Sequence, residues 1–264
     1  MINRMALANF KCFATAELEL APLTLLCGLN GTGKSSIIQA LLVLRQSYSE
    51  AALQDGRLVL SGDLADLGTG ADVLFDRAEE EELRFELRWS DGQAWGLSFK
   101  YERSSDRLEV PPDPSSSARP VFIDPSLASR APFSSNLLYV SAERIGPRKL
   151  QPHSETRVRS RDMGPRGEYA LSLLYSEQRA ALLDDDPRVL EAASLQLGDQ
   201  FDAWLQCIAP GAHVAIEPIS AADAMLGGFR FDREGDVSSE RFRATNVGFG
   251  LSYALPVHGR SRNS

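Results

Sequence analysis

The feature that most constrains this chain is a glycine-rich octapeptide, Gly28-Leu29-Asn30-Gly31-Thr32-Gly33-Lys34-Ser35. It matches the pattern G-x-x-x-x-G-K-[ST], whose glycines let the backbone turn tightly so that successive N–H groups face a phosphate. A helix starting at such a loop adds positive potential. Lys34 would neutralise the β- and γ-phosphates, the Ser35 hydroxyl would coordinate Mg²⁺, and Ser36 would lie near the α-phosphate. The pattern predicts a nucleoside triphosphate site, with ATP and Mg²⁺ as expected ligands.

The residues on either side of the loop supply its expected context. Leu23-Thr24-Leu25-Leu26-Cys27 is an apolar run of strand length, typical of a strand buried on both faces of a parallel sheet. From Ser35 to Leu44, apolar residues recur at helical spacing and predict a helix. Strand, glycine loop and helix in this order indicate an α/β phosphate-loop fold.

The remainder of the chain alternates between strand and helix patterns. Residues 1–20 predict two short strands before the loop, and alternating apolar residues at 83–89 and 95–101 predict a hairpin around Asp91-Gly92. We interpret residues 76–135 as a strand-rich insertion in a single domain that spans residues 1–264. Further along, the patterns predict strands at 137–140, 214–219, 229–232 and 241–245, and helices at 168–183, 187–208 and 251–257.

Bulk properties narrow the class of protein. The chain has 264 residues and a formal charge of −8, so contact with nucleic acid would require a local basic patch. Three widely spaced cysteines and three scattered histidines form no metal-binding pattern. Without a leader-like N-terminus or an apolar run of about 18 residues, the sequence predicts a cytoplasmic protein with no membrane segment.

Two stretches together resemble the start of RecF/SMC-like ABC-type ATPase heads of the AAA family: Asn9-Phe10-Lys11-Cys12-Phe13 and Leu25 to Ser36. More narrowly, the chain resembles bacterial ATPases found beside nuclease or effector partners in anti-phage defence loci. That resemblance extends to 62–68, 139–148, 164–169 and 246–252. It implies a homodimer that closes on ATP and switches a nuclease, effector or DNA-associated partner.

In such ATPases a signature motif from one protomer closes over the ATP held by the other. By this resemblance Asn246, Gly248, Gly250 and Ser252 would contact the partner's nucleotide in trans. Glycines and a hydroxyl at a helix start are suited to this contact, because the backbone N–H groups and the helix dipole can meet a γ-phosphate. The alternative interpretation is a plain glycine turn before a helix.

The acidic catalytic motif of these ATPases, Walker B, has no good counterpart. Val121-Phe122-Ile123-Asp124 lacks the following glutamate, and Val214-Ala215-Ile216-Glu217 lacks the Asp-Glu pair. The family places this motif after the signature helix, so we expect a C-terminally truncated head that binds ATP weakly, hydrolyses it poorly, and aggregates or needs a partner. Its catalytic residues are therefore unknown. A non-enzymatic regulatory nucleotide-binding module stays open as an alternative, and a nucleotide kinase is a third reading.

A basic stretch from Arg144 to Arg166 is the remaining functional candidate. It holds Arg144, Arg148, Lys149, Arg157, Arg159, Arg161 and Arg166. Such a group could contact the phosphates of nucleic acid or of a partner's nucleotide, whereas the alternative is a solvated loop. Lys11 is a candidate for the base end of the nucleotide. By resemblance alone, Asp63 and Asp66 fall in the segment equivalent to a Q-loop.

Overall fold

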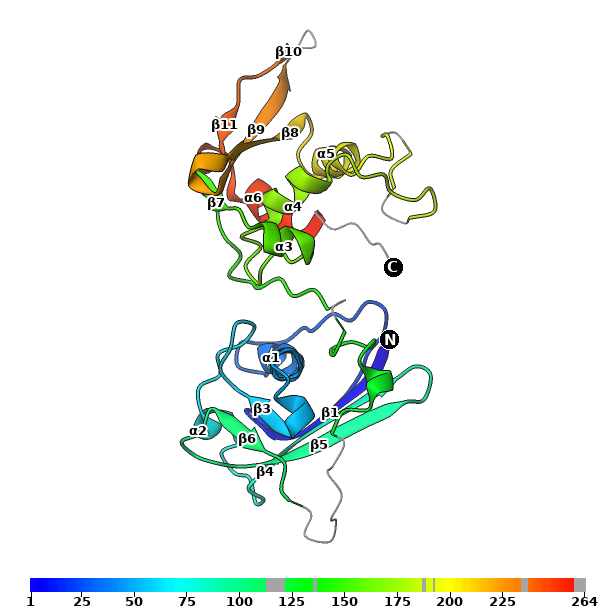
Figure 1. The fold of residues 1–264 in the computed structure, drawn as a ribbon, viewed down its shortest axis with the longest axis vertical. Coiled ribbons are helices and arrows are strands. Elements are labelled where there is room, and N and C mark those ends of the chain that lie inside the picture. The colour runs from blue at the N-terminus through cyan, green and yellow to red at the C-terminus, as the bar shows by residue number, and fades with distance from the viewer. Residues whose placement is uncertain (113–121, 135–136, 187–188, 192, 234–236, 259–264) are drawn as a thin grey trace. The chain divides into compact units, whose positions relative to one another are not determined.

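The computed structural model describes residues 1–112, 122–134, 137–186, 189–191, 193–233 and 237–258. The chain divides into two compact units, Met1–Leu138 and Tyr139–Ser264, and each is described by itself (Figure 1). Within the described residues, no helix combines the length and the apolar character needed to cross a bilayer.

The first unit is built on one antiparallel sheet. Its six strands lie in the order β2-β1-β4-β5-β6-β3. They are β1 (Ile2–Phe10), β2 (Phe13–Glu19), β3 (Arg57–Val59), β4 (Glu82–Trp89), β5 (Ala94–Lys100) and β6 (Arg107–Glu109). The two N-terminal strands and the hairpin around Asp91-Gly92 confirm the sequence patterns. Because β4 pairs directly with β1, the strands predicted as an insertion continue the same sheet as the N-terminal hairpin.

Alternation of side chains explains which face of the sheet is covered. In β4 the apolar residues Leu83, Phe85, Leu87 and Trp89 are buried, whereas the intervening Arg84, Glu86 and Arg88 are exposed. Helix α1 (Lys34–Ser49) packs over the sheet and buries its own apolar side, including Leu42, Val43 and Leu44 (Figure 1). Inside this layer, Phe10, Phe85 and Phe99 stack edge to face.

The structure contradicts the strand predicted at Leu23–Cys27. No strand is assigned there, and Leu23 and Leu25 are 88% and 82% exposed. A run of apolar residues becomes a buried strand only where neighbours hydrogen-bond to it and cover it. The described part of the first unit places β2 at its sheet edge and pairs no strand with this run. The strand predicted at 137–140 is wrong for the same kind of reason, since its described residues pair with no sheet.

Other elements of the first unit are short. They are the 3-10 turns η1 (Leu53–Asp55) and η2 (Pro125–Leu127) and the one-turn helix α2 (Gly70–Val73). A buried glutamine, Gln46, fixes the turn after β3: its amide donates to the carbonyls of Val59 and Ala65 and accepts from the Ala65 N–H. The helix predicted over Ser35–Leu44 is confirmed and continues to Ser49.

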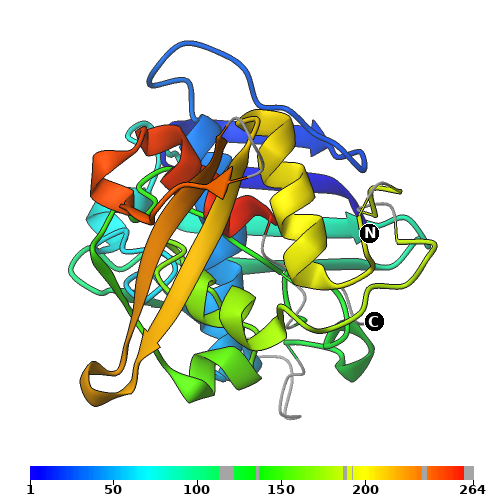
Figure 2. The same cartoon turned by 90° about the horizontal axis from the view of Figure 1, so that it is seen from above.

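The second unit is organised around β9 (Ala224–Arg233), which pairs with four other strands. They are β7 (Leu150–Pro152), β8 (Ala212–Ile219), β10 (Val237–Ser238) and β11 (Phe242–Arg243). Its helices are α3 (Glu155–Arg159), α4 (Ala170–Glu177), α5 (Leu197–Ile208) and α6 (Phe249–His258), with 3-10 turns η3 (Ser220–Ala222) and η4 (Ala244–Asn246). Figure 2 shows β8 and β9 as the long yellow-to-orange pair.

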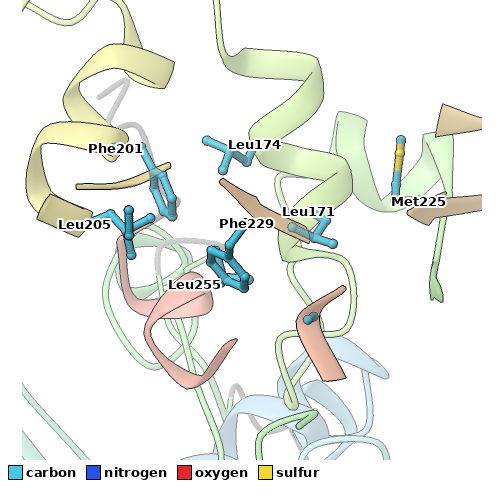
Figure 3. Close-up of a cluster of buried hydrophobic side chains, with 9 residues drawn as sticks. Leu171, Leu174, Phe201, Leu205, Met225, Phe229 and Leu255 are labelled. Atoms are coloured by element: carbon cyan, nitrogen blue, oxygen red, sulfur yellow. The ribbon is translucent and has the colours of Figure 1, made fainter. Parts of the chain in front are cut away.

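Helices α4, α5 and α6 meet this sheet in one apolar core. Leu171 and Leu174 of α4, Phe201 of α5, Phe229 of β9 and Leu255 of α6 are buried together (Figure 3). The helices predicted at 168–183 and 187–208 are shorter in the structure, because only 170–177 and 197–208 are helical among the described residues. The helix predicted at 251–257 is confirmed and begins two residues earlier.

Candidate nucleotide-binding site

The glycine loop runs directly into the first helix. Gly31 and Gly33 have φ values of 84° and 90°, in the left-handed region that favours glycine. Gly33 is the N-cap of α1, and no side chain caps the helix there. The first-turn N–H groups therefore lack a capping side chain and remain suited to an anion.

Lys34 lies folded along its own loop. Its ammonium group donates to the carbonyl oxygens of Gly28 and Leu29 at 2.8 and 2.6 Å. The Thr32 hydroxyl also donates to Leu29 O, at 2.9 Å. These bonds hold the loop around the lysine and keep its charge beside the loop backbone. Ser35 is exposed and Ser36 is buried in the first turn of α1.

The turn between β1 and β2 forms the wall beside the loop. Cys12 Sγ lies 4.0 Å from Ser36 Oγ, and Lys11 Nζ donates to Gln39 Oε1 at 2.9 Å. A methyl group on Gly33 would lie 2.3 Å from Phe13 Cζ and 2.6 Å from Cys12 Sγ. The turn therefore packs against the loop so closely that only glycine fits at position 33.

A second wall comes from the segment between α2 and β4. Backbone hydrogen bonds hold it to the end of β1: the Lys11 N–H donates to Val73 O at 2.7 Å, and the Phe75 N–H donates to Asn9 O at 3.1 Å. The Asn9 amide adds a bond to Glu82 O at 3.0 Å. This segment is thereby fixed opposite the first turn of α1.

Together these walls enclose an open pocket of about 510 Å³. The residues lining it are Lys11, Cys12, Asn30, Gly31, Gly33, Lys34, Ser35, Ser36, Asp72, Leu74 and Asp76. Two cations and two carboxylates thus share one hollow. The pKa of Asp72 lies below its ordinary value because the N–H and the hydroxyl of Thr69 donate to the carboxylate, with the charge of Lys11 acting in the same direction.

Sequence reasoning found the loop and Lys11 but missed Asp72, Asp76, Cys12 and Gln39 as neighbours of the loop. Asp72 carried a visible pattern, because Thr69 and Asp72 form a capping box three residues apart. Nothing in the local sequence shows that this box lies beside a phosphate loop almost forty residues earlier. That proximity comes from the pairing of Phe10 with Leu74.

The signature-like residues lie in the second unit, around the start of α6. Asn246, Gly248 and Gly250 are exposed, and a side chain added at either glycine would meet nothing within 4 Å. Ser252 differs, because it is 4% exposed and its hydroxyl has no hydrogen-bond partner among the described residues. The open glycines suit a surface contact, whereas the Ser252 hydroxyl faces the interior.

The acidic residues considered as substitutes for Walker B are engaged elsewhere. Asp124 caps η2 by accepting from the Ser126 N–H at 2.7 Å, and it does not line the pocket. Glu217 on β8 pairs with Arg241 at 2.7 Å. Asp66, from the Q-loop-like segment, accepts from the Ser61 hydroxyl within a tight turn, and Asp63 is exposed.

Most charges of the basic stretch have partners within the chain. Arg157 pairs with Asp162, Arg159 with Glu155 and Arg161 with Glu177. Arg166 donates to the Glu143 carbonyl, while Arg144 donates to the Tyr253 carbonyl and stacks on its ring. Within the described residues of this stretch, Arg148 and Lys149 are exposed and form no ion pair. The patch is therefore much less basic than its sequence suggests.

The three cysteines are free, and among the described residues no group of three acidic, histidine or cysteine side chains could hold a metal ion.

A glycine loop with its lysine, at an uncapped helix start and beside a β-hairpin, has the arrangement of the P-loop NTPase class. Residues 1–107 match the AAA ATPase domain family. This range contains every residue that lines the pocket.

A relative adds to this match. The chain is 30% identical over 111 residues to the DNA double-strand break repair Rad50 ATPase of Halobacterium salinarum. The similarity covers 40% of this chain and 12% of that protein, so the chain spans only a small part of the relative's length. The two matches support an ATP-binding, ATPase-type module of an AAA/SMC-like family.

Proposed function

We propose that this chain is an ATP-binding head of the ABC type, in which Gly28 to Ser36 hold Mg²⁺-ATP. The observation that carries the proposal is the position of Lys34, 2.8 and 2.6 Å from two carbonyls of its own glycine loop at an uncapped helix start. In this arrangement the backbone N–H groups and Lys34 take the β- and γ-phosphates, and the exposed Ser35 hydroxyl coordinates the magnesium ion.

The experiment is calorimetric titration of the purified chain with Mg²⁺-ATP, with turnover followed in the same samples. Replacing Lys34 by Ala should weaken binding at least 10-fold, because one charge-assisted contact to phosphate is lost. The control is Lys100→Ala, which removes an exposed lysine outside the pocket. Equal affinities for the wild type and Lys34→Ala would refute the proposal.

The finer proposal is that ATP closes a homodimer and that this closure switches a nuclease, effector or DNA-associated partner. In support, Asn246, Gly248 and Gly250 are exposed at the start of α6, where a partner's phosphate could approach. The Halobacterium relative is a DNA double-strand break repair ATPase, and Arg148 and Lys149 offer exposed positive charge. ATP-dependent dimerisation measured by light scattering, lost in Gly248→Glu, tests the first part.

A second candidate is a regulatory module that binds the nucleotide without rapid turnover. Of the two carboxylates that line the pocket, Asp72 is engaged by Thr69, and both come from the wall beside the β1–β2 turn. Asp124 and Glu217 are committed to other contacts. Binding that depends on Lys34, with turnover far below about 1 s⁻¹, would favour this function over an active ATPase.

A further inference from the structure

The pocket extends beyond the glycine loop to a wall formed by other segments of the chain. Ser36, which follows the magnesium-binding position, lies at the α-phosphate end of the loop. Its hydroxyl is 4.0 Å from Cys12 Sγ, in the turn between β1 and β2. The wall made by Lys11, Cys12, Leu74 and Asp76 therefore lies on the side where the nucleoside leaves the α-phosphate.

The two acidic residues that line the pocket, Asp72 and Asp76, differ in whether their carboxylates are free. Asp72 uses its carboxylate to hold Thr69 in the capping box. Asp76 is exposed, lines the pocket, and its carboxylate forms no hydrogen bond or ion pair with the other described residues. Its backbone is nonetheless well fixed, because the neighbouring Phe75 N–H donates to Asn9 O at 3.1 Å.

A free carboxylate that lines a phosphate pocket suits a neighbouring ligand group that donates hydrogen bonds. Carboxylates accept hydrogen bonds and cannot donate them when ionised. The group that follows the α-phosphate in a nucleotide is the ribose, whose hydroxyls are donors. Acidic side chains hold ribose hydroxyls in this way in other nucleotide-binding folds.

We infer that Asp76 accepts hydrogen bonds from the ribose hydroxyls, so that the pocket selects ribonucleotides over deoxyribonucleotides. This inference rests on the proposed function of the glycine loop and adds a residue that sets specificity within the same pocket. The phosphate loop supplies affinity for the triphosphate, whereas Asp76 recognises the sugar.

The test is titration with ATP, 2′-deoxy-ATP and inorganic tripolyphosphate in magnesium buffer. Wild-type protein should bind ATP about 10-fold more tightly than 2′-deoxy-ATP, and Asp76→Asn should lose most of this preference, because a neutral amide oxygen is a weaker acceptor than a carboxylate. Tripolyphosphate should bind both proteins equally. Glu79→Gln is the matched control, because it removes an exposed charge three residues away that does not line the pocket. Melting curves of both variants should match the wild type.

The outcomes separate this inference from the proposed function. If tight binding of ATP and tripolyphosphate is lost in Lys34→Ala but Asp76→Asn keeps the full wild-type preference for ATP over 2′-deoxy-ATP, the phosphate site stands and the role of Asp76 is wrong. An Asp76→Asn effect that is equal for all three ligands and disappears with EDTA would assign the carboxylate to the metal ion and overturn the sugar contact. Absence of Lys34-dependent binding in the wild type overturns both proposals.

Discussion

Lys11 Nζ and Gln39 Oε1 lie 2.9 Å apart, and this bond ties the turn after β1 to the second turn of α1. It holds a positive charge at the edge of the pocket, at the end where the proposed nucleotide would place its nucleoside. The bond also crosses between two elements that must keep their spacing for Cys12 and Ser36 to line one hollow.

We expect Lys11→Met to weaken ATP binding about 10-fold, because the pocket loses one of its two cations. Gln39→Leu should weaken it less, since the charge stays while its position is no longer fixed. Titration of both variants beside the wild type checks this order. Stronger loss in Gln39→Leu than in Lys11→Met would show that the bond matters for packing and not for charge.

Gly33→Ala should abolish measurable ATP binding. The added methyl group would lie 2.3 Å from Phe13 Cζ, and the residue would keep a φ of 90°, which costs about 1–3 kcal/mol for a side chain. Gly92→Ala is the matched control, because Gly92 has a φ of 87° in the β4–β5 turn with nothing within 4 Å. Both variants should lose stability in urea, but only Gly33→Ala should lose binding.

Phe133→Ala should destabilise the first unit by about 3–5 kcal/mol. Its buried ring contacts the rings of Tyr48 and Trp95, with centroids 5.3 and 5.2 Å apart. Urea unfolding followed by tryptophan fluorescence measures the loss. Leu25→Ala is the contrasting variant, and it should change the unfolding free energy by less than about 0.5 kcal/mol because Leu25 is 82% exposed.

The comparison of Leu25 with Phe85 shows what the sequence could and could not establish. Alternation in 83–89 is a local pattern, and the hairpin around Asp91-Gly92 brings its partner strand within a few residues. The run Leu23–Cys27 has an equally clear apolar pattern, but a strand buried on both faces depends on neighbours from distant segments. Its pattern alone therefore could not place it in a sheet.

The candidate site divides in the same way. The octapeptide alone predicts phosphate and magnesium as ligands, because backbone N–H groups, a lysine and a hydroxyl occupy consecutive positions. Asp76 lines the pocket only because Phe10 pairs with Leu74, and Gln39 is linked to the pocket only through its hydrogen bond to Lys11. In the signature-like segment, the sequence alone could not show that Gly248 is exposed and Ser252 is buried, because this depends on how α6 packs.

Ser252→Ala should leave ATP-dependent association unchanged and should raise the melting temperature slightly. The Ser252 hydroxyl is buried without a hydrogen-bond partner, and removing such a group relieves its desolvation cost. Gly248→Glu provides the opposite case, because it adds a charged side chain at an exposed position beside the start of α6. Loss of association in Ser252→Ala would require the hydroxyl to become exposed when two chains meet.

The stabilisation that His213 gives the second unit should be lost as the pH rises above about 6.5. Burial lowers the pKa of His213, but its hydrogen bonds to Asp232 and Asp202, both 3.2 Å long, outweigh burial and raise the pKa overall. The stabilisation is complete below the unfolded pKa and is lost as the pH rises through the folded pKa. Burial also raises the pKa of Asp202, which acts in the same direction at lower pH.

The measurement is the melting temperature of the wild type and His213→Asn between pH 5.5 and 8.5. The wild type should lose about 2–4 °C across this range relative to the variant. Parallel curves for the two proteins would assign no pH-dependent stabilisation to His213.

The pairing of β9 with four other strands has a consequence for how the second unit assembles. Its pairing with β8 closes a short connection, so this hairpin can form early from residues close in the chain. The pairing of β7 with β9 joins residues about seventy positions apart, so we expect it to form only after the β8–β9 hairpin. We expect amide protons of β8 and β9 to exchange slowest in this unit, and those of β7 to open first, so that the segment carrying the basic residues detaches before the rest of the unit unfolds.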